Sequence, residues 1–322
     1  MRAAFYEHNG SAREVIKVGD IVTPEPGPGE VRVKLATSGV NPSDVKARTG
    51  STRKIAYPRV IPHSDGAGEI DMVGDGVSIA RLGERVWLWN AQWLRAFGTC
   101  AEYVTLPSAQ AIRLPSHVSF EVGACLGIPA MTAVHAVAVA GAARGMTLLI
   151  AGGAGAVGHY AVQFAKMAGA TVISTVSSAD KAEAARAAGA DHTIDYKRDN
   201  VGERVMAITG KRGVDGIVEL DIAANAELIA HVLRSRGTVV VYGTGAMEAD
   251  VPLFFLLRNA ITLKFLYVYE LDATERAAAL NGIERALGAG LITNIGPLAE
   301  TVAAHEAVEQ NKVLGNVVVQ IR

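Results

Sequence analysis

The 322-residue sequence predicts an α/β fold in two parts, a β-rich part and a doubly wound parallel sheet. Up to about residue 124, short strand-like runs alternate with turns rich in glycine and proline. After Pro115, alanine-rich helical segments alternate with short apolar runs, the pattern of a parallel sheet covered by helices on both faces. The length exceeds what one hydrophobic core usually serves, so two domains are expected.

The β-rich part shows its strands by alternation and by turn residues. Residues 31–36 alternate apolar and polar side chains, as a half-buried strand does, and follow a turn at 23–30 that carries three prolines and two glycines. Residues 66–74 and 83–88 give further short strands between turns. This part is predicted to be a β-barrel or sandwich.

The second part begins with helical periodicity over residues 120–143. Strands and helices then alternate. Strands are expected at 147–150, 170–176, 216–220, 238–242 and 261–269, helices include 159–168 and 181–188, and a helix–strand pattern closes the chain from residue 271.

The stretch that organises this part is the glycine-rich turn at residues 151–158, between the apolar strand 147–150 and the helix that follows. Gly153, Gly155 and Gly158 fit the dinucleotide fingerprint G-x-G-x-x-G in the required strand–turn–helix context. The first glycine is expected to allow the tight turn, the second a close approach of a pyrophosphate, and the third close packing of helix on strand. Gly152, Ala156 and Val157 complete the expected binding turn, since the helix N-terminus offers its N–H groups to phosphates.

Composition and charge exclude several classes of protein. Half of the residues are hydrophobic and a fifth are charged, which is a globular composition. Lys plus Arg (31) nearly balances Asp plus Glu (32) without a basic run, so no nucleic-acid partner is expected. Neither a signal peptide nor a membrane-spanning run is expected from the sequence, and Cys100 and Cys125 have no paired spacing. A cytoplasmic protein without disulfides is expected.

Short motifs recur over nearly the whole chain. Besides the turn at 151–158, they lie at residues 39–44, 65–68, 83–86, 101–104, 188–191 and 304–307. Their order and spacing resemble those of the zinc-independent quinone oxidoreductases, the zeta-crystallin-like branch of the medium-chain dehydrogenase/reductase superfamily. The resemblance implies a GroES-like catalytic domain formed by residues 1–124 and 266–322. It implies a Rossmann nucleotide-binding domain inserted at residues 125–265.

The expected cofactor is NADPH. NAD sites usually carry an acid about twenty residues after the glycines, at the end of the second strand. That strand end reads Ser174-Thr175-Val176-Ser177-Ser178 and has no acid, while Lys181 follows. Serine hydroxyls and an ammonium suit a 2′-phosphate, and the resemblance implies that Ser177, Lys181 and Tyr196 hold it. Lys181 as an ordinary solvated helix residue remains the alternative.

The positions that hold zinc in related alcohol dehydrogenases carry other residues here, so no metal is expected. The Cys-Gly-x-Asp corner of those enzymes reads Asn41-Pro42-Ser43-Asp44, and their Gly-His-Glu reads His63-Ser64-Asp65. The four-cysteine structural lobe of those enzymes is absent as well. His63 is expected to be a neutral, hydrogen-bonded histidine at a domain edge.

The candidate catalytic residues that the resemblance implies are Asn41, Asp44 and Thr132. Asn41 is expected beside the nicotinamide, with Thr132 across the cleft, although an Asn-Pro turn alone would explain Asn41. Asp44 is expected to be structural or cofactor-orienting rather than a general base. The loop Gly243-Thr244-Gly245 is expected to pass near the cofactor.

Reduction of a quinone by NADPH is the leading functional prediction. An NADPH-dependent alkenal, enone or enoyl-thioester reductase is the alternative, although the tyrosine that donates the proton in enoyl-thioester reductases is Thr52 here. An NADPH-binding structural or regulatory protein is a third possibility. Trp87, Trp89 and Trp93 either line a cleft for a flat ring or belong to the core.

The sequence also predicts a homodimer. The apolar strand expected at 261–269 would invite pairing if it were left at a sheet edge, and in similar enzymes it pairs with its twin.

Overall fold

A computed structural model of the chain describes residues 1–311 and 313–321. The chain divides into two compact units, the first formed by residues 1–129 and 293–322 and the second by residues 130–292. The first unit is therefore built from both ends of the sequence. Residues 266–292 group with the second unit, whereas the resemblance implied that they belong to the first.

The first unit is an antiparallel β structure with small helices. Its strands are β1 (Arg2–Phe5), β2 (Lys17–Asp20), β3 (Glu30–Val40), β4 (Asp65–Val73), β5 (Arg85–Leu88), β6 (Tyr103–Pro107), β7 (Ala111–Arg113) and β14 (Val317–Gln320). Its helices are α1 (Ala12–Val15), α2 (Pro42–Thr49), α3 (Phe120–Gly123) and α11 (Thr301–Glu309), with 3₁₀ turns η1 (Ile79–Arg81) and η2 (Ser108–Gln110).

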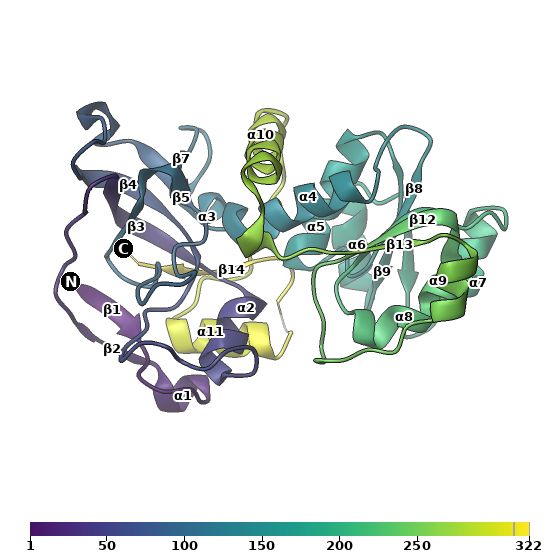
Figure 1. Cartoon of the computed structure of the whole chain (residues 1–322), viewed down its shortest axis with the longest axis horizontal. Helices are drawn as coiled ribbons and strands as arrows, with labels where there is room; N and C mark the ends of the chain where they lie inside the picture. The colour runs from purple at the N-terminus through teal and green to yellow at the C-terminus, as the bar shows by residue number, and fades with distance from the viewer. Residues whose placement is uncertain (312, 322) are drawn as a thin grey trace. The chain divides into compact units, whose positions relative to one another are not determined.

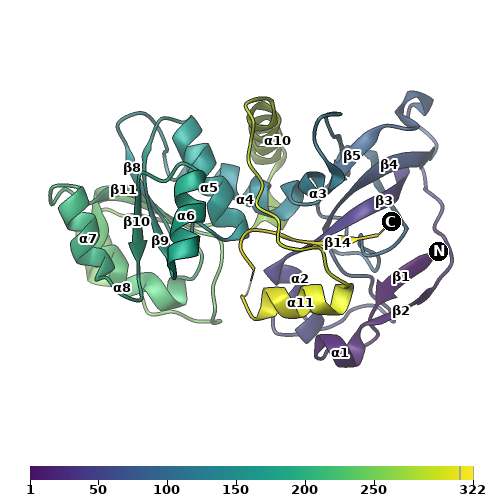
Figure 2. The same ribbon diagram turned by 180° about the vertical axis from the view of Figure 1, so that it is seen from behind.

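The long strand β3 is the axis of the larger sheet in this unit. The strand order is β14-β3-β4-β5-β7, and β6 also pairs with β3. Val31, Val33 and Leu35 are fully buried on the inner face of β3, as the predicted alternation requires. Helices α2 and α11 lie side by side beneath the sheet (Figures 1 and 2).

The second unit is a six-stranded parallel sheet. Its strands are β8 (Thr147–Ile150), β9 (Thr171–Val176), β10 (His192–Asp195), β11 (Val214–Glu219), β12 (Leu233–Val241) and β13 (Thr262–Phe265). Its helices are α4 (Met131–Val139), α5 (Ala156–Met167), α6 (Ala179–Ala187), α7 (Val201–Ile208), α8 (Ile222–Val232), α9 (Leu253–Arg258) and α10 (Ala273–Gly288), with a 3₁₀ turn η4 (Val268–Glu270).

The strand order in this parallel sheet is β10-β9-β8-β11-β12-β13. Successive strands are added on one side of β8 up to β10, and on its other side from β11 onward, so the order reverses between β8 and β11. This is the Rossmann order, and ligands of such sheets bind at the carboxyl ends of the strands beside the reversal. Helices α4, α5 and α6 cover one face and α7, α8 and α9 cover the other (Figures 1 and 2). The glycine-rich turn leaves β8 at that reversal.

Two elements differ from the sequence-based expectation. The helical stretch at 120–143 is divided into α3, a π-helix at Leu126–Ala130 and α4, because Pro129 lacks the N–H that a continuous helix needs. The strand expected at 261–269 ends at Phe265, since η4 turns the chain away before α10. No helix in the described part of the chain is long and apolar enough to cross a membrane.

Candidate functional site

The glycine-rich turn of the second unit is shaped by close backbone contacts. Gly152 has φ +65°, so the left-handed residue of the turn is Gly152, whereas the fingerprint assigned the tight turn to Gly153. A Cβ on Gly153 would lie 2.1 Å from Ser174 Oγ, and one on Gly158 would lie 2.2 Å from the Gly152 carbonyl oxygen. These two glycines therefore allow the turn to pack against β9 and the helix to pack against the turn.

Gly155 has a different role from its neighbours. It is exposed, it is the N-cap of α5 without a side-chain cap, and a Cβ there would meet nothing nearer than the Gly152 oxygen at 3.3 Å. The first N–H groups of a helix have no partner within the helix and attract anions. Ala156 and Val157, in that first turn, are half-buried. The turn fits the pyrophosphate of a dinucleotide, and Gly155 leaves the space that such a group needs.

Polar residues gather at the ends of β9 and β10. Ser177 directly follows β9, and the N–H of Tyr196 donates to Val176 O at 3.1 Å, which brings Tyr196 beside the end of β9. Ser178 caps α6 by accepting from the Lys181 N–H at 3.3 Å. The side chain of Tyr196 is 54% exposed and that of Lys181 is half-buried. Among the described residues, the Lys181 ammonium forms no ion pair.

A second glycine loop follows β12 and is held by β11. A Cβ on Gly243 would lie 2.4 Å from the Leu220 oxygen, and the N–H of Gly245 donates to Asp221 Oδ1 at 2.8 Å. Thr244 bonds within the loop, to Ala246. A Cβ on Gly152 would lie 2.5 Å from Leu220 Cδ2, so Leu220 lies between the two glycine loops. The predicted loop thus belongs to the same edge of the sheet as the fingerprint.

In the first unit, Asn41 lies between two buried carboxyl groups. Its main-chain N–H donates to Asp44 Oδ2 at 2.8 Å in a capping box at the start of α2, and its side-chain Nδ2 donates to Asp65 Oδ2 at 2.8 Å. Asp65 also accepts from the Ile128 N–H at 2.9 Å. The amide of Asn41 is therefore oriented by Asp65, for which the sequence predicted no role in the site.

Burial governs the electrostatics of these carboxyl groups. Desolvation raises the pKa of Asp44 to about 7, against the effect of its hydrogen bond from the Asn41 N–H. Desolvation also raises the pKa of Asp65 well above its ordinary value, although Ile128 and Asn41 donate to it. The structure thus joins Asn41 and Asp44 of the predicted set to a second buried acid. Thr132 lies in the first turn of α4, in the second unit, and is buried.

His63 is a fully buried histidine with φ +79°. Its Nδ1 contacts Ser38 Oγ at 2.8 Å and its Nε2 contacts His305 Nε2 at 3.0 Å. Burial lowers the pKa of His63 well below its usual value, and His305 acts in the same direction, so the ring is neutral.

The tryptophans and Thr52 differ in their surroundings. Trp87 and Trp89 are buried, with 2% and 6% of their surfaces exposed, whereas the ring of Trp93 stacks under the Arg53 guanidinium at 5.4 Å. Trp87 therefore belongs to the core, as one of the two interpretations held. Thr52 is exposed.

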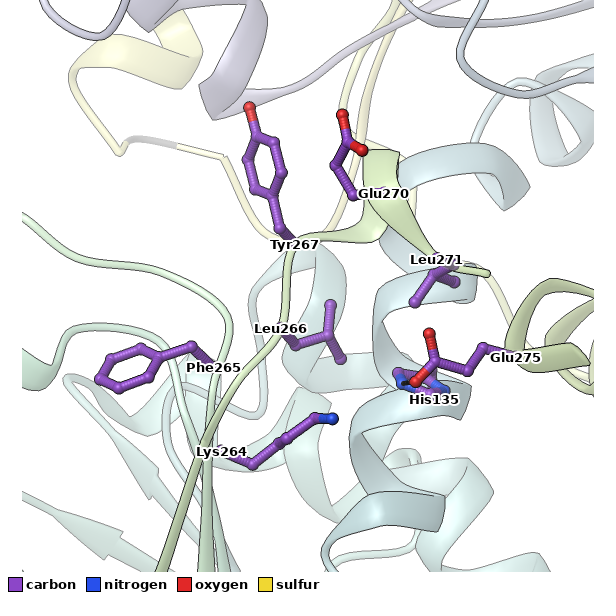
Figure 3. Close-up of a pocket in the computed structure, with 8 residues that line it drawn as sticks. All are labelled: His135, Lys264, Phe265, Leu266, Tyr267, Glu270, Leu271 and Glu275. Atoms are coloured by element: carbon purple, nitrogen blue, oxygen red, sulfur yellow. Dashed lines mark ion pairs between the residues drawn. The ribbon is translucent and has the colours of Figure 1, made fainter. Parts of the chain in front are cut away.

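A separate surface pocket lies along β13 and involves none of the predicted cofactor residues. Its lining residues are His135, Lys264, Phe265, Leu266, Tyr267, Glu270, Leu271 and Glu275. His135 Nε2 lies 3.5 Å from Glu275 Oε1, and the rings of Phe265 and Tyr267 point away from His135 (Figure 3). Burial lowers the pKa of His135, Glu275 opposes this shift and Lys264 adds to it.

Comparisons with known proteins identify the family. Residues 27–116 match the alcohol dehydrogenase GroES-like domain, and residues 156–283 match the zinc-binding dehydrogenase domain. A quinone oxidoreductase of Rattus norvegicus is 31% identical over 301 residues, which cover 92% of this chain and 90% of the relative. The chain belongs to the zeta-crystallin-like quinone oxidoreductases of the medium-chain dehydrogenase/reductase superfamily. It is an oxidoreductase, with a GroES-like part and a Rossmann part, as the sequence predicted.

Two further relatives widen the range of the family. A 2-haloacrylate reductase of a Burkholderia species is 30% identical over 320 residues, covering 95% of this chain and 93% of that relative. A mycobacterial protein solved in complex with NADPH has a TM-score of 0.88 and 29% identity, with 99% of this chain and all of that chain covered. The relatives of this chain thus include a 2-haloacrylate reductase as well as quinone oxidoreductases.

Proposed function

We propose that this quinone oxidoreductase homologue transfers hydride from NADPH to a quinone without a zinc ion. The proposed catalytic domain is the first unit and the proposed nucleotide domain is the second. The observation that carries the cofactor part is the edge of the Rossmann sheet, where the open Gly155 lies at the start of α5 and Lys181 stands beyond an acid-free strand end. The relative solved with NADPH supports this choice of cofactor.

The proposed roles of the nucleotide residues agree with where these residues lie. The N–H groups at the start of α5 receive the pyrophosphate, while Ser177, Lys181 and Tyr196 receive the 2′-phosphate at the ends of β9 and β10. Ser178 contributes indirectly, since its hydroxyl caps α6 and so fixes the backbone of Lys181. Gly243, Thr244 and Gly245 belong to the loop on the other side of Leu220 and are proposed to pass near the cofactor. NADPH, when bound there, supplies the hydride.

The class of hydride acceptor is inferred from residues 41–44, which match the zinc-binding Cys-Gly-x-Asp segment of related alcohol dehydrogenases. Asn41 stands where related alcohol dehydrogenases have a cysteine, and its amide already donates to Asp65. Reduction of a simple ketone needs a strong electrophile for the developing alkoxide. A quinone needs less, because its reduced oxygens are delocalised and take protons from water. Asn41 and Thr132 would then orient the ring and the nicotinamide, and Asp44 would hold Asn41 in place.

The test is a comparison of kcat/KM values for a naphthoquinone, an alkenal, a 2-haloacrylate and an enoyl thioester, each with NADPH and with or without EDTA. Quinone turnover is expected to exceed the others at least about tenfold, the effect of roughly 1.4 kcal/mol in transition-state binding, and to survive EDTA. Loss of quinone turnover in EDTA would contradict the zinc-free mechanism.

Reduction of an activated double bond is the second candidate, because one relative is a 2-haloacrylate reductase. This reaction delivers a proton to carbon, a step that a positioned acid accelerates. The exposed Thr52 is a poor acid at the position where enoyl-thioester reductases carry tyrosine. A tenfold advantage of the haloacrylate or the alkenal in the same panel would select this candidate. NADPH binding without turnover of any acceptor would instead indicate a structural or regulatory role.

We also propose a homodimer in the cytoplasm. Edge strand β13 is flanked by exposed apolar side chains on itself and on α9, among them Phe254 (74% exposed), Leu257 (75%) and Phe265 (65%). A free edge with such neighbours favours pairing with a second copy. Both cysteines are buried thiols, as is usual in a reducing compartment. Sedimentation at micromolar concentration tests the dimer, and Phe265→Lys should shift the protein towards monomer.

A further inference from the structure

The buried contact between His63 and His305 belongs to a longer run of side chains in the first unit. His305 Nε2 lies 3.0 Å from His63 Nε2, His63 Nδ1 lies 2.8 Å from Ser38 Oγ, and Ser38 Oγ lies 2.7 Å from Thr99 Oγ1. Thr99 Oγ1 donates to the main-chain oxygen of Asp65 at 2.5 Å. All four side chains belong to residues that are fully buried. The run therefore starts on α11 and ends at the first residue of β4.

The direction of every hydrogen bond in this run follows from its last contact. A carbonyl oxygen only accepts, so the single hydroxyl proton of Thr99 is used on Asp65 O. Ser38 must then donate to Thr99, and this bond uses the single hydroxyl proton of Ser38. The contact between Ser38 and His63 consequently needs an Nδ1–H on His63.

The tautomer of His305 follows in turn. Burial keeps the His63 ring neutral, so with its proton on Nδ1 its Nε2 can only accept. His305 therefore donates through Nε2–H and keeps a bare Nδ1. That atom is buried and has no hydrogen-bond partner among the residues that the structure describes. The assignment thus leaves a bare ring nitrogen, and not an N–H donor, without a partner in the described part of the chain.

We propose that His305, His63, Ser38 and Thr99 form a one-way hydrogen-bond chain that positions Asp65, and through it the amide of Asn41. His63, Ser64 and Asp65 are consecutive in sequence, and Asp65 Oδ2 accepts a hydrogen bond from Asn41 Nδ2 at 2.8 Å. The same hydrogen bonds hold His63 at φ +79°, a backbone conformation that costs a non-glycine residue free energy. His63 and His305 are thus positioning residues. The part of this proposal that concerns turnover rests on the proposed role of Asn41.

The first test measures protonation without any substrate. Long-range ¹H–¹⁵N correlation spectra of the whole chain labelled with ¹⁵N-histidine distinguish the two neutral tautomers of each ring. The expected result is a proton on Nδ1 of His63 and on Nε2 of His305 at pH 7.5. The reverse pair of tautomers, or a doubly protonated ring at either residue, overturns the proposal. This readout is independent of which acceptor the enzyme reduces.

The second test uses a matched pair of variants at His305. His305→Gln retains an N–H donor near the position of Nε2, whereas His305→Leu does not. His305→Leu is expected to lower kcat for a naphthoquinone by about ten- to a hundred-fold, the scale of a misplaced reacting group, with the Kd of NADPH changed less than threefold. His305→Gln is expected to restore most of kcat. The exposed His117 provides the control His117→Gln, expected to match the wild type.

A third readout separates failure of this proposal from failure of the proposed function. The side-chain amide protons of Asn41 should exchange with solvent at least tenfold faster in His305→Leu than in the wild type or in His305→Gln. Equal exchange rates in all three proteins contradict the positioning role even if quinones are good substrates. If His305→Leu does not fold, the tautomers of the wild-type rings still decide the proposal.

Discussion

The two sites of this protein are built from different materials. In the second unit, the binding edge is made of main-chain atoms, and glycines keep it clear of side chains. In the first unit, the site is made of buried polar side chains that hold one another, namely Asn41 with Asp44 and Asp65, and His63 with His305. A main-chain site depends on glycines, which have no side chain to block it. A side-chain site depends on pairs of residues that lie far apart in the sequence. Substitutions should therefore damage the two sites in different ways.

The largest effect is expected from a charge added to the first unit. Asn41→Asp would place a third carboxyl between Asp44 and Asp65 and remove the donor to Asp65. Because breaking a buried polar pair and leaving an unpaired charge costs about 3–5 kcal/mol, urea unfolding at pH 8 should show a loss of that size.

The same variant gives a pH dependence of known sign. The folded-state pKa of the added carboxyl is raised above its unfolded value by burial, so the folded form holds its proton more tightly. Stability relative to the wild type should fall as pH rises from about 4 towards 8. Asn41→Ala removes the donor without adding a charge and is the control. A deficit of Asn41→Asp that grows as the pH is lowered would falsify this account.

The next effect concerns the glycine turn. Gly158→Ala places a Cβ 2.2 Å from the carbonyl oxygen of Gly152. The backbone must therefore move, at a cost of about 1–3 kcal/mol. Both the Tm and the affinity for NADPH should fall. At Gly155 the nearest atom is at 3.3 Å, so Gly155→Ala should lower the Tm less than Gly158→Ala does and should act mainly by weakening NADPH. Calorimetry and fluorescence titration measure the two quantities, and identical behaviour of the two variants would count against the assigned roles.

A smaller and more selective effect is expected at Lys181. Removing a charge-assisted hydrogen bond costs on the order of 1.5–3 kcal/mol, so Lys181→Ala should weaken NADPH about ten- to a hundred-fold and leave NADH nearly unchanged. The exposed Arg204, on α7, gives a charge-matched control in Arg204→Ala. Equal losses for both cofactors, or a wild-type preference for NADH, would exclude a 2′-phosphate contact.

The smallest effect is the contribution of His305 to acid stability. Burial lowers its pKa to about 3, with Arg48 acting in the same direction, while the unfolded chain keeps an ordinary histidine. The unfolded state therefore binds the extra proton, and stability is lost as pH falls below about 6.5, by at most about 1.4 kcal/mol per pH unit. His305→Gln lacks this contribution. The Tm advantage of the wild type over His305→Gln should shrink by a few degrees between pH 7 and pH 5, and an advantage that widens would refute the assignment.

The sequence predicted the second unit better than the first for the same reason that the two sites differ. The fingerprint at 151–158 is local, and the order of strands and helices around it follows from periodicity, so this turn was predicted apart from details such as the role of Gly152. The Asn41–Asp65 and His63–His305 contacts join residues that no local pattern connects. Asp65 could have been noticed in His63-Ser64-Asp65, the segment that matches Gly-His-Glu of the zinc enzymes. An acid that is kept there without the zinc-binding histidine needs another buried partner.

The end of β13 and the extent of the second unit also depended on tertiary structure. Residues 261–269 are apolar enough for a long strand, and the exposed Phe265 and Tyr267 alternate with the buried Leu266 and Val268 as they would in one. The chain turns at η4 and α10 then packs on α4. Helix-to-helix packing of this kind is decided by shape, which the alternation of residue types does not encode.

The discontinuous first unit has a consequence for the order of folding. β14 pairs with β3, and His305 reaches His63, only after the whole of the second unit has been synthesised. The second unit is continuous and can complete its sheet on the ribosome, whereas the first must wait with an unpaired edge on β3 until the last residues emerge. Docking of α11 therefore closes the first unit, and a chain truncated before residue 301 should leave the ribosome with a finished nucleotide fold and an open, aggregation-prone β-sheet.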